Sequence, residues 1–230
     1  MNGSALFLRY AYAPNLLGYC GPADTGALLE FGAPGRAGTG FRALAKQFEG
    51  AWPQLRTIAA ATGTADPLDG EVVEAYWIGN RLLDRAGDAE GGLPHHSFQV
   101  FCLYPWANLL LDERRTEHAL QVLDQCRIRW GRVITVSADQ VVAESRPLVW
   151  DGTRLTLGVP CRETVNRGFD GVSLIGPLHP GDWVSMHWNW VCDRLTTAQL
   201  VALRHYSAYH LGLVNQRLGG RAGTSGPRIQ

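Results

Sequence analysis

The sequence lacks an excess of charge of either sign. Its 230 residues carry 21 Lys and Arg against 21 Asp and Glu, so the formal net charge is zero and the pI is near 7.0. Proteins that bind nucleic acids or anionic membranes through bulk charge need a basic excess, because each neutralised phosphate requires a Lys or Arg. We therefore expect neither a nucleic acid nor a membrane as partner.

Long hydrophobic runs and export signals are also lacking. The longest apolar stretches, such as residues 107–111, are far shorter than the ~20 residues that span a bilayer. The first residues have neither the basic region nor the long apolar region of a secretory signal. These absences predict a cytoplasmic protein.

Cysteines are few and follow no metal-binding or disulfide pattern. The five are odd in number and form no Cys-x-x-Cys pair, which argues against a disulfide framework and against a four-cysteine zinc site. We expect reduced thiols, most of them buried. The five are Cys20, Cys102, Cys126, Cys161 and Cys192.

Common catalytic motifs are missing as well. The sequence contains no GxxxxGK[ST] phosphate loop, no GxGxxG after a strand, no GxSxG elbow and no HExxH helix. Nucleotide-driven, dinucleotide-dependent and ordinary serine-hydrolase chemistry therefore lack their signatures.

What is present is enough apolar sequence for a sizeable core, arranged with a helical period in the first half. Apolar residues at spacings of three and four predict one amphipathic helix over residues 41–58, which Pro53 would kink. A second helix follows Asp69 as its N-cap, a third starts at Pro94, and a fourth covers residues 113–124. The first half is therefore predicted to be mostly helical.

After Cys126 the apolar period changes to two, which predicts strands. Asp151 and Gly152 are typical of a two-residue type I′ hairpin turn. Thr196 and Gln199 form a capping box that starts a last helix. The predicted strands are residues 128–136, 140–150, 153–157, 162–166 and 181–191.

These elements predict an α+β protein. It begins with an N-terminal helical domain of residues 1–124, followed by a small five-stranded OB-like β-barrel of residues 125–194. A C-terminal helix of residues 195–218 packs on both. Residues 219–230 are rich in Gly, Ser and Arg and are expected to form a disordered tail.

The predicted strand 181–191 carries the most informative side chain, His187. Side chains alternate across a strand, so Val184 and Met186 face the barrel interior and His187 faces away from it. There its imidazole either binds a metal or a partner, or only packs under the helical domain. Asp182 lies an odd number of residues away and is expected on the opposite face.

Two segments of the second half resemble one known family. Residues 126–134 read Cys-Arg-Ile-Arg-Trp-Gly-Arg-Val-Ile, and residues 181–187 read Gly-Asp-Trp-Val-Ser-Met-His. Both are similar to motifs of the HypC/HupF hydrogenase-assembly chaperones, which begin Met-Cys, three residues, Pro-Gly-x-Val and later carry Gly-Asp-Tyr-Val-Leu-Val-His. The resemblance covers residues 126–218, in the same order, and leaves the first 125 residues unexplained.

The resemblance implies an OB-like barrel that binds an iron centre, either bare iron or the Fe(CN)₂CO unit destined for nickel-iron hydrogenase. It assigns Cys126 as a metal ligand and His187 as its nearby functional residue. A thiolate and an imidazole both suit iron. The implied partners are a hydrogenase large subunit or other maturation proteins.

The sequence departs from the family pattern at two points. Cys126 is internal here, so it lacks the free amino group that the family's cysteine has after removal of Met. Trp130 replaces the family's Pro before Gly131, which changes the approach to the site. A small buried residue at the junction of the two domains is the other interpretation of Cys126.

Further side chains are candidates for a pocket around this site. Arg127 and Arg129 flank Cys126 and are expected to lower the pKa of its thiol. Adjacent residues of a helix point about 100° apart, so His95 and His96 are not expected to share one ion, and one of them is expected to be exposed. The remaining candidates are Trp130, Gly131, Asp182, Asn189, Glu74 and Cys20.

The sequence thus predicts a metallochaperone of hydrogenase maturation, an assembly factor rather than an enzyme. One alternative is an iron-dependent enzyme with a pocket between the helical domain and the barrel, which uses histidines and carboxylates such as Glu49 and Glu74. Another is a metal-free module that presents Trp183 and Asn189 to a protein partner.

Overall fold

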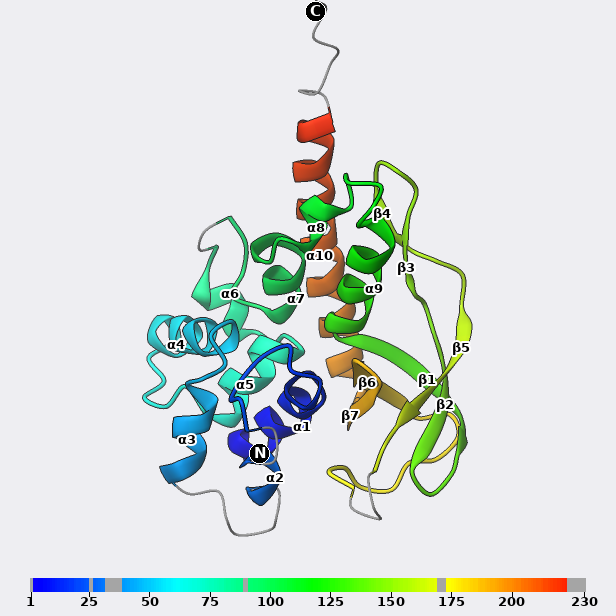
Figure 1. The fold of residues 1–230 in the computed structure, drawn as a ribbon. Coiled ribbons are helices and arrows are strands. Elements are labelled where there is room, and N and C mark those ends of the chain that lie inside the picture. Colours follow the sequence, from blue (N-terminus) through cyan, green and yellow to red (C-terminus); the bar gives the residue numbers. More distant parts are fainter. Residues whose placement is uncertain (1, 25–26, 32–38, 89–90, 169–172, 223–230) are drawn as a thin grey trace, which may run out of the picture.

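The structure is a computed structural model that describes residues 2–24, 27–31, 39–88, 91–168 and 173–222. Helices gather on one side of the molecule and a closed β-barrel lies on the other (Figure 1). The long helix α10, Thr197–Ala222, follows the barrel in sequence and packs on α7, on the π-helical turn η1 and on β4. The predicted α+β class, with N-terminal helices, a five-stranded barrel and a C-terminal helix, is confirmed.

The first helix, α1, spans Gly3–Leu16 and was not predicted from the sequence. Asn2 caps it, because its side chain accepts a hydrogen bond from the N–H of Ala5 at 3.2 Å. Ten of its fourteen residues are buried. A helix that is covered on nearly all sides shows no apolar stripe, so its sequence carries no helical period.

The predicted helix over residues 41–58 is wrong in its continuity. The structure has two helices there, α3 over Thr39–Ala45 and α4 over Ala51–Thr62. Pro53 lies in the first turn of α4, where its missing N–H costs nothing. In the middle of one long helix the same residue would remove a hydrogen bond and clash with the preceding turn.

The helix predicted after Asp69 is confirmed as α5, Gly70–Trp77, with the Asp69 carboxylate accepting from the N–H of Glu71 at 2.8 Å. It ends just before Gly79, which adopts a φ of 96°. Residues with a Cβ atom rarely adopt such a positive φ, because the Cβ clashes with the backbone. The other described helices are α2 Ala27–Glu30, α6 Leu82–Ala86, α7 His96–Phe98, η1 Gln99–Leu103, α8 Trp106–Leu109 and α9 Thr116–Cys126.

The barrel closes in the strand order β1-β2-β5-β7-β6. Its interior holds apolar side chains, among them Val133, Val141, Val165, Val184 and Met186. The strands are β1 Arg129–Val136, β2 Gln140–Ser145, β5 Cys161–Asn166, β6 Trp183–His187 and β7 Trp190–Arg194.

Three predicted strands differ from the observed ones. Residues 140–150 divide into β2, which belongs to the barrel, and β3, which does not. Residues 153–157 contribute β4, Leu155–Leu157, which pairs with β3, Leu148–Trp150, in a separate two-stranded sheet. Residues 181–191 form two barrel strands, because the chain reverses after β6 at Trp188, whose φ is 54°. The barrel still has five strands because this division replaces the strand lost to the small sheet.

The hairpin between β3 and β4 is confirmed, but its turn lies one residue later than predicted. The N–H of Asp151 donates to the carbonyl of Arg154 at 3.2 Å, so Gly152 and Thr153 are the two central residues. The Asp151 carboxylate accepts from the N–H groups of Thr153 and Arg154, which stabilises this register.

The capping box of the last helix is confirmed. The Thr196 hydroxyl accepts from the N–H of Gln199 at 3.2 Å, and the Gln199 side chain accepts from the N–H of Thr196 at 2.9 Å. The helix continues to Ala222, so the predicted tail begins too early; residues 223–230 lie outside the described part of the chain. None of the described helices is long and apolar enough to cross a membrane.

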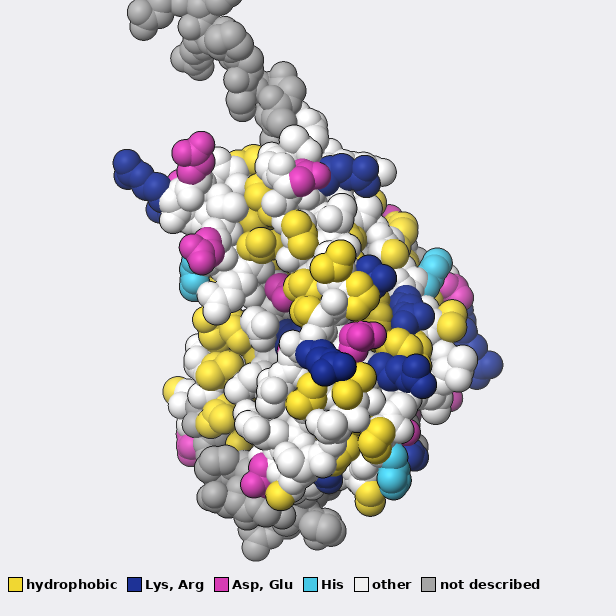
Figure 2. All heavy atoms as spheres, turned by 90° about the vertical axis from the view of Figure 1, so that its right-hand side faces the viewer, with side chains coloured by type: hydrophobic (Ala, Val, Ile, Leu, Met, Phe, Trp, Pro, Cys, Tyr) yellow, Lys and Arg dark blue, Asp and Glu magenta, His cyan; other side chains and the backbone are white. Residues whose placement is uncertain are grey.

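One apolar cluster joins the helices to the barrel. It contains residues of α1, α4 and α5, and it continues into Ile128 and Cys192 at the barrel and Leu203 of α10. The far side of the barrel is different: the face in Figure 2 mixes Lys and Arg with Asp and Glu and hydrophobic side chains. The site described next lies at the joined side.

Candidate metal centre

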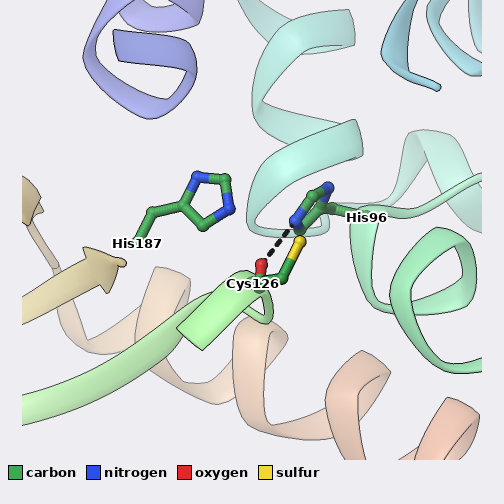
Figure 3. A group of neighbouring side chains, drawn as sticks. All are labelled: His96, Cys126 and His187. Carbon is green, nitrogen blue, oxygen red and sulfur yellow. Dashed lines mark hydrogen bonds between the residues drawn. The ribbon is translucent and has the colours of Figure 1, made fainter. Parts of the chain in front are cut away.

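Three potential metal ligands from separate elements meet where the helices pack on the barrel. His96 is the first residue of α7, Cys126 the last of α9 and His187 the last of β6. One ligand atom of each lies within 4.8 Å of the other two. Figure 3 shows the imidazole of His187 reaching toward Cys126 and His96 from the end of its strand. The structure therefore brings together Cys126 and His187, the two predicted ligands, and adds His96.

His187 is oriented by the helical half. As predicted, it faces away from the barrel interior, and its ring packs 5.6 Å from that of Trp77. Its Nδ1 lies 2.7 Å from the carbonyl oxygen of Tyr10, which only accepts, so Nδ1 carries the proton. Its Nε2 is buried and has no hydrogen-bond partner among the described residues. A histidine held in this way presents a lone pair on Nε2.

His96 is held by hydrogen bonds at both ring nitrogens. Its Nε2–H donates to the carbonyl oxygen of Cys126 at 2.8 Å, and its Nδ1 accepts from the Tyr76 hydroxyl at 3.1 Å. For Nε2 to ligate an ion, its proton must move to Nδ1, where the Tyr76 oxygen can accept it. The hydrogen bond to Cys126 would then be replaced by the bond to the ion.

Burial sets the protonation of all three groups. It lowers the pKa of His96 to about 4 and the pKa of His187 well below its usual range, so both imidazoles are neutral near pH 7. Burial raises the pKa of the Cys126 thiol well above its ordinary value. The site thus holds two neutral imidazoles and a protonated thiol near pH 7.

The prediction that Arg127 and Arg129 lower the pKa of Cys126 is wrong. The Arg127 guanidinium is paired with Asp124 at 2.8 Å. Arg129 is paired with Glu163 at 3.0 Å. With both cations committed to carboxylates, loss of hydration dominates the pKa of the thiol.

A cavity of about 650 Å³ adjoins the three ligands. Cys20 lines it from the turn after α1, and burial raises the pKa of that thiol to about 12. The cavity is large enough to hold small molecules beside an ion. Its other lining side chains include Tyr19, Glu49, Tyr76, Gln99, Tyr104, Trp106 and Trp188.

The remaining candidate residues of the barrel lie away from the three converging side chains. Asp182 accepts from the N–H of His179 at 2.9 Å, and Asn189 is exposed in the turn between β6 and β7. A Cβ on Gly131 would lie 3.0 Å from the Met186 methyl group in the barrel interior. The guanidinium groups of Arg127 and Arg204 each lie 5.9 Å from the ring centre of Trp130. None of these side chains lines the cavity.

The predicted carboxylates do not join a histidine cluster. Glu74 accepts from the side-chain amide of Gln199 at 2.9 Å, and Glu49 lies exposed at the cavity. Among the described residues, the one group of three or more His, Cys, Asp and Glu with converging ligand atoms is His96, Cys126 and His187.

His95 and His96 point into different environments, but the predicted reason is wrong, because the helix begins at His96 and not at Pro94, and His95 is its extended N-cap residue. His95 meets Ser97, whose hydroxyl also lies 2.7 Å from Nδ1 of His210. The expectation that one of the two histidines is exposed is wrong, because both are at most 5% exposed. His210 was missed, although it continues the buried face of α10 that holds Leu203, Tyr206 and Val214 at helical spacing.

Acidification is expected to unfold the protein, because burial depresses the pKa of His95, His96, His187 and His210. Their unfolded pKa is about 6.5, so below this pH the unfolded state binds protons that the folded state excludes. The free energy of unfolding keeps its full value above pH 6.5. It falls as the pH drops from 6.5 toward the pKa values of the folded state, which are about 4 for His96 and His210. Near pH 4, proton uptake linked to each of these two histidines is expected to lower the free energy of unfolding by on the order of 3 kcal/mol.

Urea unfolding of the metal-free protein at pH 7, 6, 5 and 4 measures this loss. The His205→Gln variant, which removes an exposed histidine and keeps the four buried ones, should show the same dependence. A free energy of unfolding that stays constant between pH 7 and 5 would contradict the prediction.

A family model matches the part of the chain that holds the three candidate ligands. The model of a family of unknown function (DUF6390) matches residues 1–91 and 87–221, and the second segment contains all three. No curated protein and no solved structure matches the chain.

Proposed function

We propose that this chain, which belongs to the family of unknown function DUF6390, binds an iron centre through His96, Cys126 and His187 and acts in hydrogenase maturation. In this proposal it is a cytoplasmic assembly factor that delivers iron, bare or as Fe(CN)₂CO, to a hydrogenase large subunit or another maturation protein. The observation that carries the proposal is the convergence of its ligand atoms within 4.8 Å. Two of these residues, Cys126 and His187, are the ones that the HypC/HupF resemblance assigns.

The chemistry of the site supports a transition metal. Nε2 of His187 is buried without a partner in the described part of the chain, a state that an ion would relieve. Imidazole and thiolate ligands suit iron as well as zinc, copper and nickel, so the choice of iron rests on the resemblance. Bound iron would supply a centre that can carry cyanide and carbon monoxide. The adjoining cavity of about 650 Å³ has room for such ligands.

Infrared spectroscopy tests the proposal. The chain is produced anaerobically together with hydrogenase maturation proteins and purified, and its spectrum is recorded where metal-bound cyanide and carbon monoxide absorb. We expect bands from the natural sequence and none from Cys126→Ala. Cys161→Ala is the matched control, because Cys161 is exposed on the barrel and should leave the bands unchanged. Absence of bands from the natural sequence, or their persistence in Cys126→Ala, would overturn delivery of ligated iron.

An iron-dependent enzyme is the second candidate, and the cavity is the observation that favours it. The space beside the ligands is lined by groups able to bind a substrate, including Gln99, Tyr104 and Glu49. Stoichiometric iron that survives purification in air without infrared bands would favour this alternative over a chaperone.

A further inference from the structure

α1 contains a proline near its end, and this proline leaves one carbonyl of the helix without its usual donor. In a regular α-helix the N–H of residue 14 would donate to the carbonyl of residue 10. Pro14 has no N–H, and its ring crowds that carbonyl. The oxygen of Tyr10 can therefore accept a hydrogen bond from outside the helix.

The donor that meets this oxygen is His187. Its Nδ1 lies 2.7 Å from the Tyr10 oxygen, and both residues are buried, with exposures of 1% and 0%. Because the carbonyl only accepts, the proton of the neutral ring resides on Nδ1. The lone pair is then on Nε2, the nitrogen that has no partner among the residues described.

Neighbouring contacts hold α1 in place against the strand that carries His187. The Tyr10 hydroxyl lies 2.7 Å from that of Ser185, which is on the same face of β6 as His187. Arg9 forms an ion pair with Asp193 of β7 at 2.9 Å. Trp77 stacks on Tyr10 at 5.3 Å. The Tyr10 carbonyl is thus presented to the imidazole by a rigidly packed helix.

We infer that Pro14 is a positioning residue: by withholding an N–H from Tyr10, it leaves that carbonyl to hold His187 as the Nδ1–H tautomer with Nε2 directed at Cys126 and His96. Hydrogen bonds of this kind orient the histidine ligands of metal sites and set their basicity. The tautomer follows from the fold alone. Its consequence for metal affinity rests on the proposed function.

Pro14→Ala tests the inference, because it introduces an N–H that competes for the Tyr10 oxygen. Long-range proton–nitrogen NMR of the metal-free protein should show His187 as the Nδ1–H tautomer in the natural sequence, assigned by its loss in His187→Gln. Pro14→Ala should populate the Nε2–H tautomer. In an anaerobic titration with cobalt(II), used in place of iron, its affinity should fall about tenfold, the lower end of the ~10–100-fold range for such groups.

Pro53→Ala is the control, since it also removes a proline from a helix but lies in α4, away from the lining of the cavity. It should change neither the tautomer nor the affinity. An unchanged His187 tautomer in Pro14→Ala would overturn the inference, whether or not the protein binds metal. A tautomer shift in a protein that binds no cobalt(II) would sustain the inference and reject the proposed function.

Discussion

Cys126→Ala is expected to weaken the binding of iron(II), or of cobalt(II) in its place, by more than about 100-fold, beyond the ~10–100-fold that changes to outer groups cause. The substitution removes the sole sulfur of the three converging ligands. Thiolate is the strongest donor of the set, and two imidazoles alone hold such ions weakly. The measurement is an anaerobic equilibrium dialysis against cobalt(II), which reports binding whether or not a thiolate is present.

The pH dependence of binding adds a second measure of the same change. Burial raises the pKa of Cys126 and keeps both imidazoles neutral, so each bound ion displaces one thiol proton near pH 7. The apparent affinity of the natural sequence should therefore rise about tenfold per pH unit. Cys126→Ala should lose this slope, and Cys161→Ala should keep both slope and affinity. Equal affinities of Cys126→Ala and the natural sequence would reject the metal centre.

Arg129→Ala is expected to lower the free energy of unfolding by about 3–5 kcal/mol, the range for breaking a buried ion pair. Arg129 is 1% exposed and donates to Glu163 at 3.0 Å and to the carbonyl of Trp188 at 2.5 Å. It also donates to the carbonyls of Asp124 at 3.2 Å and Gln125 at 3.4 Å. Its removal leaves a partly buried carboxylate without a counterion and three carbonyls without this donor.

Urea unfolding at pH 7 measures this effect. Arg132→Ala is the matched control, because Arg132 is exposed on the same strand and its loss should change stability by no more than about 0.5 kcal/mol. Arg129 bonds residues next to Cys126 and next to His187, so Arg129→Ala should also weaken cobalt(II) binding. An Arg129→Ala protein as stable as Arg132→Ala would show that the buried pair does not hold this junction together.

Two elements that the sequence failed to predict were missed for different physical reasons. α1 is buried on nearly all sides, so it has no polar face and no period. The division of residues 181–191 into β6 and β7 depends on a positive φ at Trp188, which a sequence of bulky residues does not suggest. That reversal is stabilised by remote groups, since the N–H of Trp188 donates to the carbonyl of Gln125.

The sequence by itself determined features that depend on a few neighbouring residues. These include the Asp69 cap of α5, the capping box at Thr196 and the outward face of His187, because caps and strand alternation are set by local geometry. Only the tertiary structure decided that His96 joins Cys126 and His187, and that Pro14 frees a carbonyl for His187. Both depend on how α1, α7 and α9 pack against the end of β6, and contacts between distant segments leave no spacing that a single sequence reveals.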